Sequence, residues 1–90
     1  MTTRYQQESN AEAAPLENGL MVLEPTSNKF CALNSTSTMI WSQLEEPASP
    51  EQLAEFVSKS FQGVSASDAL PDVQAILEEM TSLGIVVTVE

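Results

Sequence analysis

The chain has no histidine, only one cysteine and only three basic side chains among its 90 residues. Without histidine, the commonest general base and the commonest metal ligand are missing. A single cysteine cannot form an internal disulfide, so the sequence favours a reducing, cytoplasmic compartment. No apolar run approaches the roughly 20 residues of a membrane span, and the first residues lack the basic and apolar segments of a secretory signal. These absences argue against a membrane or secreted protein.

Acidic residues outnumber basic ones thirteen to three, which gives a net charge of −10. The resulting field repels phosphate backbones and anionic lipid, so we expect neither nucleic-acid nor membrane-surface binding. The acidic pairs Glu45-Glu46 and Glu78-Glu79 are adjacent in the sequence. Neighbours on a helix point about 100° apart, so solvated helix faces explain both pairs better than a converging acid–base dyad.

Other signals of chemistry are also missing. The three glycines are scattered and form no phosphate loop, and no serine stands in a Gly-x-Ser-x-Gly turn. Cys31 lies in an apolar stretch, where burial would raise the pKa of the thiol and leave it unreactive. Trp41 is interpreted as a core residue. We therefore expect a protein that is not an enzyme, with no catalytic residue, no cofactor and no metal site.

Two short apolar segments, 20–24 and 29–33, predict a β-hairpin because the turn-forming sequence Pro-Thr-Ser-Asn joins them. Symmetrical folding places Glu24 opposite Lys29, a charge pair that would help to fix the register. Side chains alternate along a strand. One face would carry Leu20, Val22, Cys31 and Leu33, and the other would carry Met21, Leu23, Phe30 and Ala32. Both faces are apolar, so we expect the helices to cover one face and the third helix to cover part of the other.

The residues before this hairpin give weaker signals. Residues 1–12 are polar and are predicted to form a disordered tail, which leaves 13–90 as the folded domain. Asn18-Gly19 is a two-residue turn signal with both positions at positive φ. If that turn is used, a strand over 13–17 pairs with 20–24 in a three-stranded antiparallel meander. Whether 13–17 forms this strand stays open.

Two helices are predicted after the hairpin. The first begins at an N-cap within Asn34-Ser35-Thr36 and runs to about Glu45, before Pro47. The second begins at Ser49, where Ser49 and Gln52 make a capping box around a proline at the first helical position. Its apolar face carries Leu53, Phe56, Val57 and Phe61, and a glycine ends it at position 63.

A third helix is capped within residues 65–68, with Pro71 expected in its first turn and Gly84 as a left-handed C-terminal cap. The β-branched run 85–89 is either a closing strand or an ordered tail. The order of elements predicts an α+β, winged-helix-like domain. In it a three-stranded antiparallel sheet is followed by three helices and a short C-terminal strand.

Because the signals of catalysis are missing, binding is the function that the sequence favours. The unpaired edge of an apolar hairpin invites an extended peptide to add as another strand. Alternatively the edge is merely short and covered, or it pairs with a second copy in a homodimer. A structural or regulatory subunit docked permanently on a larger enzyme is a further alternative. A winged-helix nucleic-acid binder is permitted by the topology and opposed by the charge.

In their order and spacing, four short motifs of this sequence resemble the pattern of the PqqD-like family of small peptide chaperones, over roughly residues 18–89. These domains are also called RiPP recognition elements, for ribosomally made and post-translationally modified peptides. The motifs are Leu33-Asn34, Ile40-Trp41, Asp72-Val73 with Leu77, and Leu83-Gly84-Ile85.

This resemblance implies a non-catalytic domain that binds the leader of a precursor peptide. The leader would add beside the last hairpin strand, in a groove against the third helix, and the domain would present it to a peptide-modifying enzyme or a leader peptidase. Carried over by position, one wall of the groove is Lys29, Phe30, Cys31, Ala32 and Leu33. The other wall is Asp72, Val73, Ile76, Leu77, Glu79 and Met80.

Overall fold

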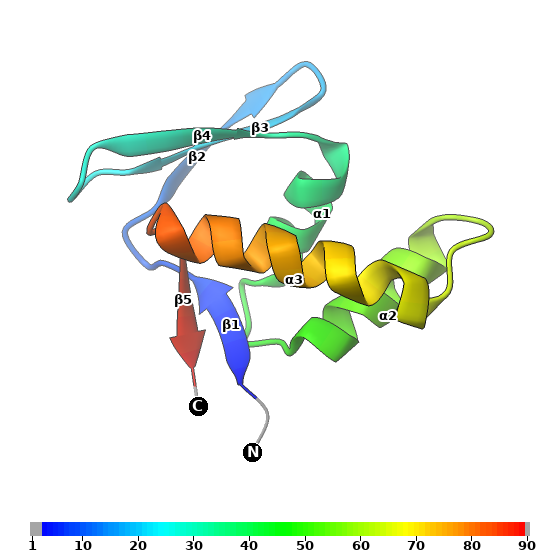
Figure 1. Ribbon diagram of the computed structural model, residues 1–90. Coiled ribbons are helices and arrows are strands. Elements are labelled where there is room, and N and C mark those ends of the chain that lie inside the picture. Colours follow the sequence, from blue (N-terminus) through cyan, green and yellow to red (C-terminus); the bar gives the residue numbers. More distant parts are fainter. Residues whose placement is uncertain (1–2, 90) are drawn as a thin grey trace.

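The computed structural model describes residues 3–89, in which four strands precede three helices and a fifth strand closes the chain (Figure 1). The strands are β1 (Arg4–Gln7), β2 (Glu12–Leu16), β3 (Gly19–Glu24), β4 (Lys29–Leu33) and β5 (Val86–Val89). The helices are α1 (Ser35–Gln43), α2 (Pro50–Ser60) and α3 (Ala66–Ser82). Strands β2, β3 and β4 form an antiparallel meander, while β1 and β5 pair in a separate two-stranded sheet. The predicted α+β, winged-helix-like architecture is confirmed, with one strand more than expected.

That additional strand, β1, contradicts the prediction of a disordered tail over 1–12. Its residues pair with β5, from Arg4 opposite Val89 to Gln7 opposite Val86. Backbone hydrogen bonds also tie it to the segment after α1, since Tyr5 exchanges two with Ala48, at 2.8 and 2.9 Å. Composition hid this strand because it is polar and its partner stands at the other end of the chain. Residues 1–2 lie outside the described part of the chain.

The β3–β4 hairpin has the predicted register, with Leu20 opposite Leu33 and Glu24 opposite Lys29. The loop between the strands is closed by Glu24, which is only 6% exposed. Its carboxylate accepts hydrogen bonds from the backbone N–H of Thr26 at 3.2 Å and from the N–H and hydroxyl of Ser27, each at 2.6 Å. The carboxylate therefore holds the loop backbone, a role that the proposed charge pair did not anticipate.

These hydrogen bonds predict a pH-dependent stability. They favour the ionised form and hold the pKa of Glu24 below its ordinary value of 4.5, chiefly through the Ser27 hydroxyl and N–H. A lowered folded pKa contributes stability above pH 4.5, and the contribution is lost as pH falls through the folded value. We expect Glu24→Gln to lower the melting temperature at pH 7 and to lower it by less at pH 3. Thermal unfolding at both pH values measures this, with Glu17→Gln in an exposed turn as the control; an equal deficit at both would contradict it.

The predicted first strand of the meander is present, and it begins and ends one residue earlier than predicted. β2 spans Glu12–Leu16 and places Leu16 opposite Gly19, so the two loop residues are Glu17 and Asn18. Gly19 is not at positive φ. A Cβ at this position would collide with the carbonyl oxygen of Leu33 in β4. The glycine is therefore required by the close approach of β4 and not by the turn.

The helix caps follow the sequence. The Asn34 side chain accepts from the Ser37 N–H at 2.8 Å, and the predicted capping box of Ser49 and Gln52 is present. Ser65 caps α3 by accepting from the Asp68 N–H at 3.1 Å. Because α3 already begins at Ala66, Pro71 lies inside the helix, and the prediction that it falls in the first turn is wrong.

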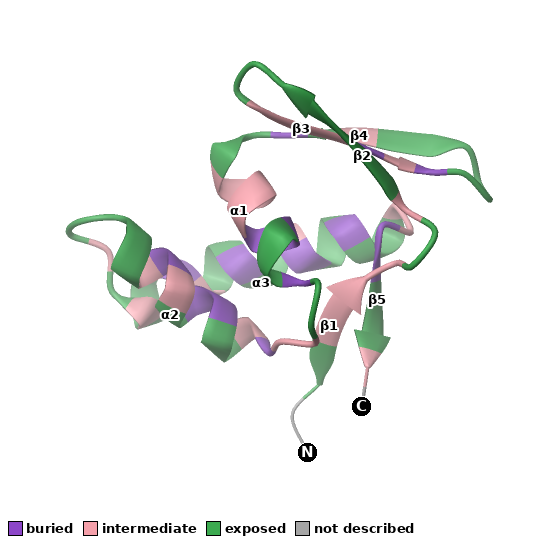
Figure 2. Cartoon of the chain, turned by 180° about the vertical axis from the view of Figure 1, so that it is seen from behind, coloured by how far each residue is buried: buried purple, intermediate pink, exposed green. Residues whose placement is uncertain are grey.

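The helices pack against one face of the β2–β3–β4 sheet (Figures 1 and 2). The core lies between them and is built from aliphatic side chains around Trp41, whose indole N–H donates to the carbonyl of Ile85 at 3.3 Å. Val22 and Leu33 are the buried apolar residues that the meander contributes to this core. No described helix covers the opposite face, so the prediction that the third helix covers part of it is wrong.

Candidate functional site

The two edges of the meander differ in how well they could accept another strand. β2 forms one edge, and Pro15 removes a backbone donor from it. β4 forms the other edge, with no proline and with Lys29, Phe30 and Ala32 exposed. An edge strand with free N–H and C=O groups is a template for pairing with another chain. The β4 edge is therefore the better place for strand addition.

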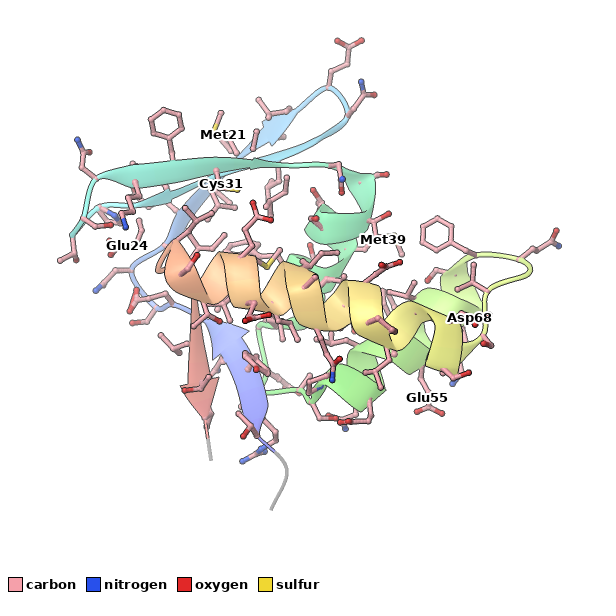
Figure 3. The ribbon with its side chains drawn as sticks, in the orientation of Figure 1. Met21, Glu24, Cys31, Met39, Glu55 and Asp68 are labelled. Carbon is pink, nitrogen blue, oxygen red and sulfur yellow. The ribbon has the colours of Figure 1, made fainter. Side chains whose placement is uncertain are left out.

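A hollow of about 190 Å³ opens between the end of β4 and α3. Within β4, the alternation of side chains turns Cys31 and Leu33 toward the helices, and Figure 3 shows Cys31 pointing at α3. Ile76 and Met80 approach from the helix, with Glu79 beside them. The lining residues are Cys31, Ala32, Leu33, Asn34, Ser37, Ile76, Glu79 and Met80. The hollow thus combines apolar side chains with polar groups, one of which is a carboxylate.

Part of the predicted site lies elsewhere. Val73 and Leu77 are 1% and 0% exposed and belong to the core, and neither lines this hollow. Phe30 is 68% exposed and pairs with Leu23 on the face of the sheet that points away from the helices. Lys29 is exposed at the loop end of β4 and does not line the hollow. A helical stripe identifies which residues face inward, but it does not distinguish a core residue from a groove residue.

Asp72 lines a second hollow, of about 360 Å³, which the sequence did not predict. This one lies among α1, α2 and α3 and is bordered by Asp68 and Asp72, one helical turn apart. Ile76 lines both hollows, so the two adjoin along α3. The residues are Thr36, Ile40, Val57, Phe61, Val64, Asp68, Ala69, Asp72, Val73 and Ile76. The sequence signal that could have indicated this hollow is Phe61, an aromatic residue close to the predicted end of the second helix. In the structure it lies just past the end of α2 and is 38% exposed.

The pKa of the thiol in the first hollow is shifted in the direction that the sequence predicted. Burial raises the pKa of Cys31 above its ordinary value of 9.0, and the Glu79 carboxylate raises it further. Because the thiolate is the nucleophile, we expect iodoacetamide to alkylate Cys31 more slowly at pH 7 in the folded chain than in urea. Glu79→Gln should shift the pH profile of alkylation downward, as followed by mass spectrometry. An unchanged profile would show that Glu79 does not act on the thiol.

Residues 3–89 contain no group of three or more His, Cys, Asp or Glu side chains able to hold a metal ion. Over the same residues, no helix is both long and apolar enough to cross a membrane. What these residues do offer is an open strand edge beside a hollow with both polar and apolar lining.

A known protein family matches most of this chain. The family described as coenzyme PQQ synthesis protein D (PqqD) matches residues 19–86. The chain belongs to the PqqD family. The matched part runs from the start of β3 to the first residue of β5, so it contains the β4 edge, α3 and both hollows. Strands β1 and β2 lie outside the part of this chain that matches the PqqD family.

Solved structures share the whole fold. A lasso peptide synthetase B1 complexed with the leader peptide aligns with a TM-score of 0.77 and 23% identity, covering 92% of this chain and 96% of that one. TbiB1 in complex with the TbiA(beta) leader peptide aligns with a TM-score of 0.79 and 17% identity, covering 90% and 93%. A comparison with curated protein sequences finds no match. The two alignments cover 92% and 90% of this chain, so the similarity extends beyond the residues that match the PqqD family.

Proposed function

We propose that this protein binds the leader region of a ribosomally made precursor peptide and presents it to another enzyme, without catalysing a reaction itself. The open β4 edge beside the hollow against α3 carries this proposal. Membership of the PqqD family supports it, and both similar structures are complexes with a leader peptide. The partner is a peptide-modifying enzyme or a leader peptidase, and a cytoplasmic location suits the single free thiol.

In this mode the leader adds to β4 as a fourth strand. Main-chain hydrogen bonds supply affinity that depends little on sequence, and side-chain pockets supply selectivity. One apolar leader side chain enters the hollow formed by Cys31, Ile76 and Met80. The second hollow extends the groove along α3 from Ile76 toward Asp68, where a longer leader has room for another apolar anchor.

Titration of the isotope-labelled protein with a synthetic leader tests the proposal. We expect amide shifts in β4 and along α3 at the same peptide concentrations, with smaller changes in β1 and β5. Shifts confined to the acidic surface, or none, would overturn it. Sedimentation over a range of protein concentrations tests the competing occupant, since a homodimer through the β4 edge would dissociate on dilution and compete with the peptide.

The carboxylates along the groove predict a salt dependence. Asp72 and Glu79 each lie in the lining of one hollow, where they would attract Lys or Arg beside the apolar residues of a leader. Charges at a rim act mainly on the association rate and are screened within about 8 Å at physiological ionic strength. We expect the association rate of a leader with such residues to fall as salt is raised. The double variant Asp72→Asn, Glu79→Gln should lose most of this dependence, as measured by stopped-flow fluorescence.

A further inference from the structure

The face of the β2–β3–β4 sheet that points away from the helices is apolar and uncovered, and the proposed function does not use it. We call it the outer face. Figure 3 shows Met21 pointing away from α3. Cross-strand pairs place Ala14, Met21 and Ala32 in one row and Glu12, Leu23 and Phe30 in the next, with Leu16 beyond them. Phe30 is 68% exposed and Leu16 is 43% exposed, and contiguous apolar patches of this kind mark interaction sites.

Charge decides which occupant fits the outer face. Within the three strands, Glu12 is the only charged side chain on this face, and Glu17 stands in the adjoining turn. The whole chain carries a net charge of −10, so two copies brought face to face would repel each other. A partner with an apolar surface bordered by Lys or Arg complements both the patch and its acidic surroundings. A different, basic-rimmed protein therefore fits better than a second copy.

Position decides which protein that is. The outer face shares β4 with the groove: Phe30 points outward, while its neighbour Cys31 points at α3. A leader strand added at the β4 edge would extend the same sheet, so alternate leader side chains would join the outer face. A protein docked there would contact the outward side chains of the bound leader directly.

We propose that the outer face is the docking surface for the enzyme that acts on the bound precursor, with Phe30 as its main anchor. This inference rests on the proposed function, because it takes the leader to lie along β4. It assigns the two sides of one strand to two partners. The inward side chains of β4 select the leader, and the outward side chains bind the enzyme through an apolar surface with a basic rim.

The test compares two affinities in the same variants. The probes are the purified enzyme that modifies the precursor, measured by biolayer interferometry, and a labelled synthetic leader, measured by fluorescence anisotropy. We expect Phe30→Ser to weaken enzyme binding at least tenfold, because truncation of an exposed aromatic anchor typically has such an effect. Leader affinity should fall by less than about fivefold, because Phe30 can lose only a cross-strand contact with an outward side chain of the leader. Phe30→Lys should weaken enzyme binding further, because it adds repulsion against a basic rim.

Val87→Ser is the matched control, since Val87 is an exposed apolar strand residue outside this sheet, in β5. It should leave both affinities unchanged. Equal enzyme affinity of Phe30→Ser and the wild type would overturn the proposal, as would a wild-type chain that does not bind the enzyme. Self-association that Phe30→Ser abolishes would assign the face to a second copy and also overturn it. A chain that binds the enzyme through Phe30 but never binds leader would refute the proposed function and leave the docking surface standing.

Discussion

Ile76→Glu should abolish most of the leader affinity. Ile76 lines both hollows and is the residue at which they adjoin, so one substitution acts on the whole length of the proposed groove. It removes an apolar contact worth about 1.5–3 kcal/mol when a side chain of this size is fully buried. It also adds a carboxylate that a bound peptide would have to desolvate. We expect the dissociation constant to rise by about 10- to 100-fold, measured by anisotropy of a labelled leader.

Ala75→Glu supplies the matched control. It introduces the same side chain one residue earlier on α3, at an exposed position, and changes the net charge by the same amount. Leader affinity should be close to that of the wild type, and both variants should show the circular dichroism of the folded chain. If the two variants lose affinity equally, the effect is one of overall charge, and the groove along α3 is not the binding surface.

Removal of residues 1–8 should destabilise the domain strongly, because it deletes β1. That strand pairs with β5 along one edge, and it hydrogen-bonds to the segment after α1 through Tyr5 and Gln7. The Gln7 side chain also donates to the carbonyl of Trp41 at 2.8 Å. Each such bond contributes about 0.5–1.5 kcal/mol net, partly offset by the entropy of ordering the strand. We expect a loss of about 3 kcal/mol, or a fall in melting temperature of about 12–24 °C.

Point variants separate this effect from that of a shortened chain. Tyr5→Ala removes a side chain that packs against the core, and it should reproduce part of the loss. Arg4→Ala changes an exposed residue of the same strand and should change stability by no more than about 0.5 kcal/mol. Equal melting temperatures for the shortened and full-length chains would mean that β1 contributes nothing to the fold.

Local signals in the sequence predicted much of the fold. The β3–β4 register followed from the symmetry of two apolar segments about their loop, and the capping box at Ser49 from one short motif. The same local reasoning failed at Pro71 and Gly19. Pro71 was misplaced because the sequence offers several possible N-caps for α3, and the residue that caps the helix, Ser65, is the earliest of them. Gly19 makes room for the carbonyl oxygen of Leu33 at the far end of the following strand, a contact that the local turn signal does not record.

The sequence alone determined the class of fold and the position of the edge strand. The absence of histidine, the single cysteine and the charge of −10 favoured a binding function. The apolar strand 29–33 had no predicted partner for its second edge. Periodicity in α3 identified its inward side, because the repeat of a helix can be read residue by residue.

Only the tertiary structure decided which surface each of these residues serves. Leu77 and Ile76 share one helical stripe, yet Leu77 is core and Ile76 lines both hollows. Alternation alone puts Phe30 and Cys31 on opposite faces of β4, but the position of all three helices on one side of the sheet decides which of the two faces is covered. β1 exists because β5 returns to meet it. Each outcome depends on contacts between distant parts of the chain, which no local pattern records.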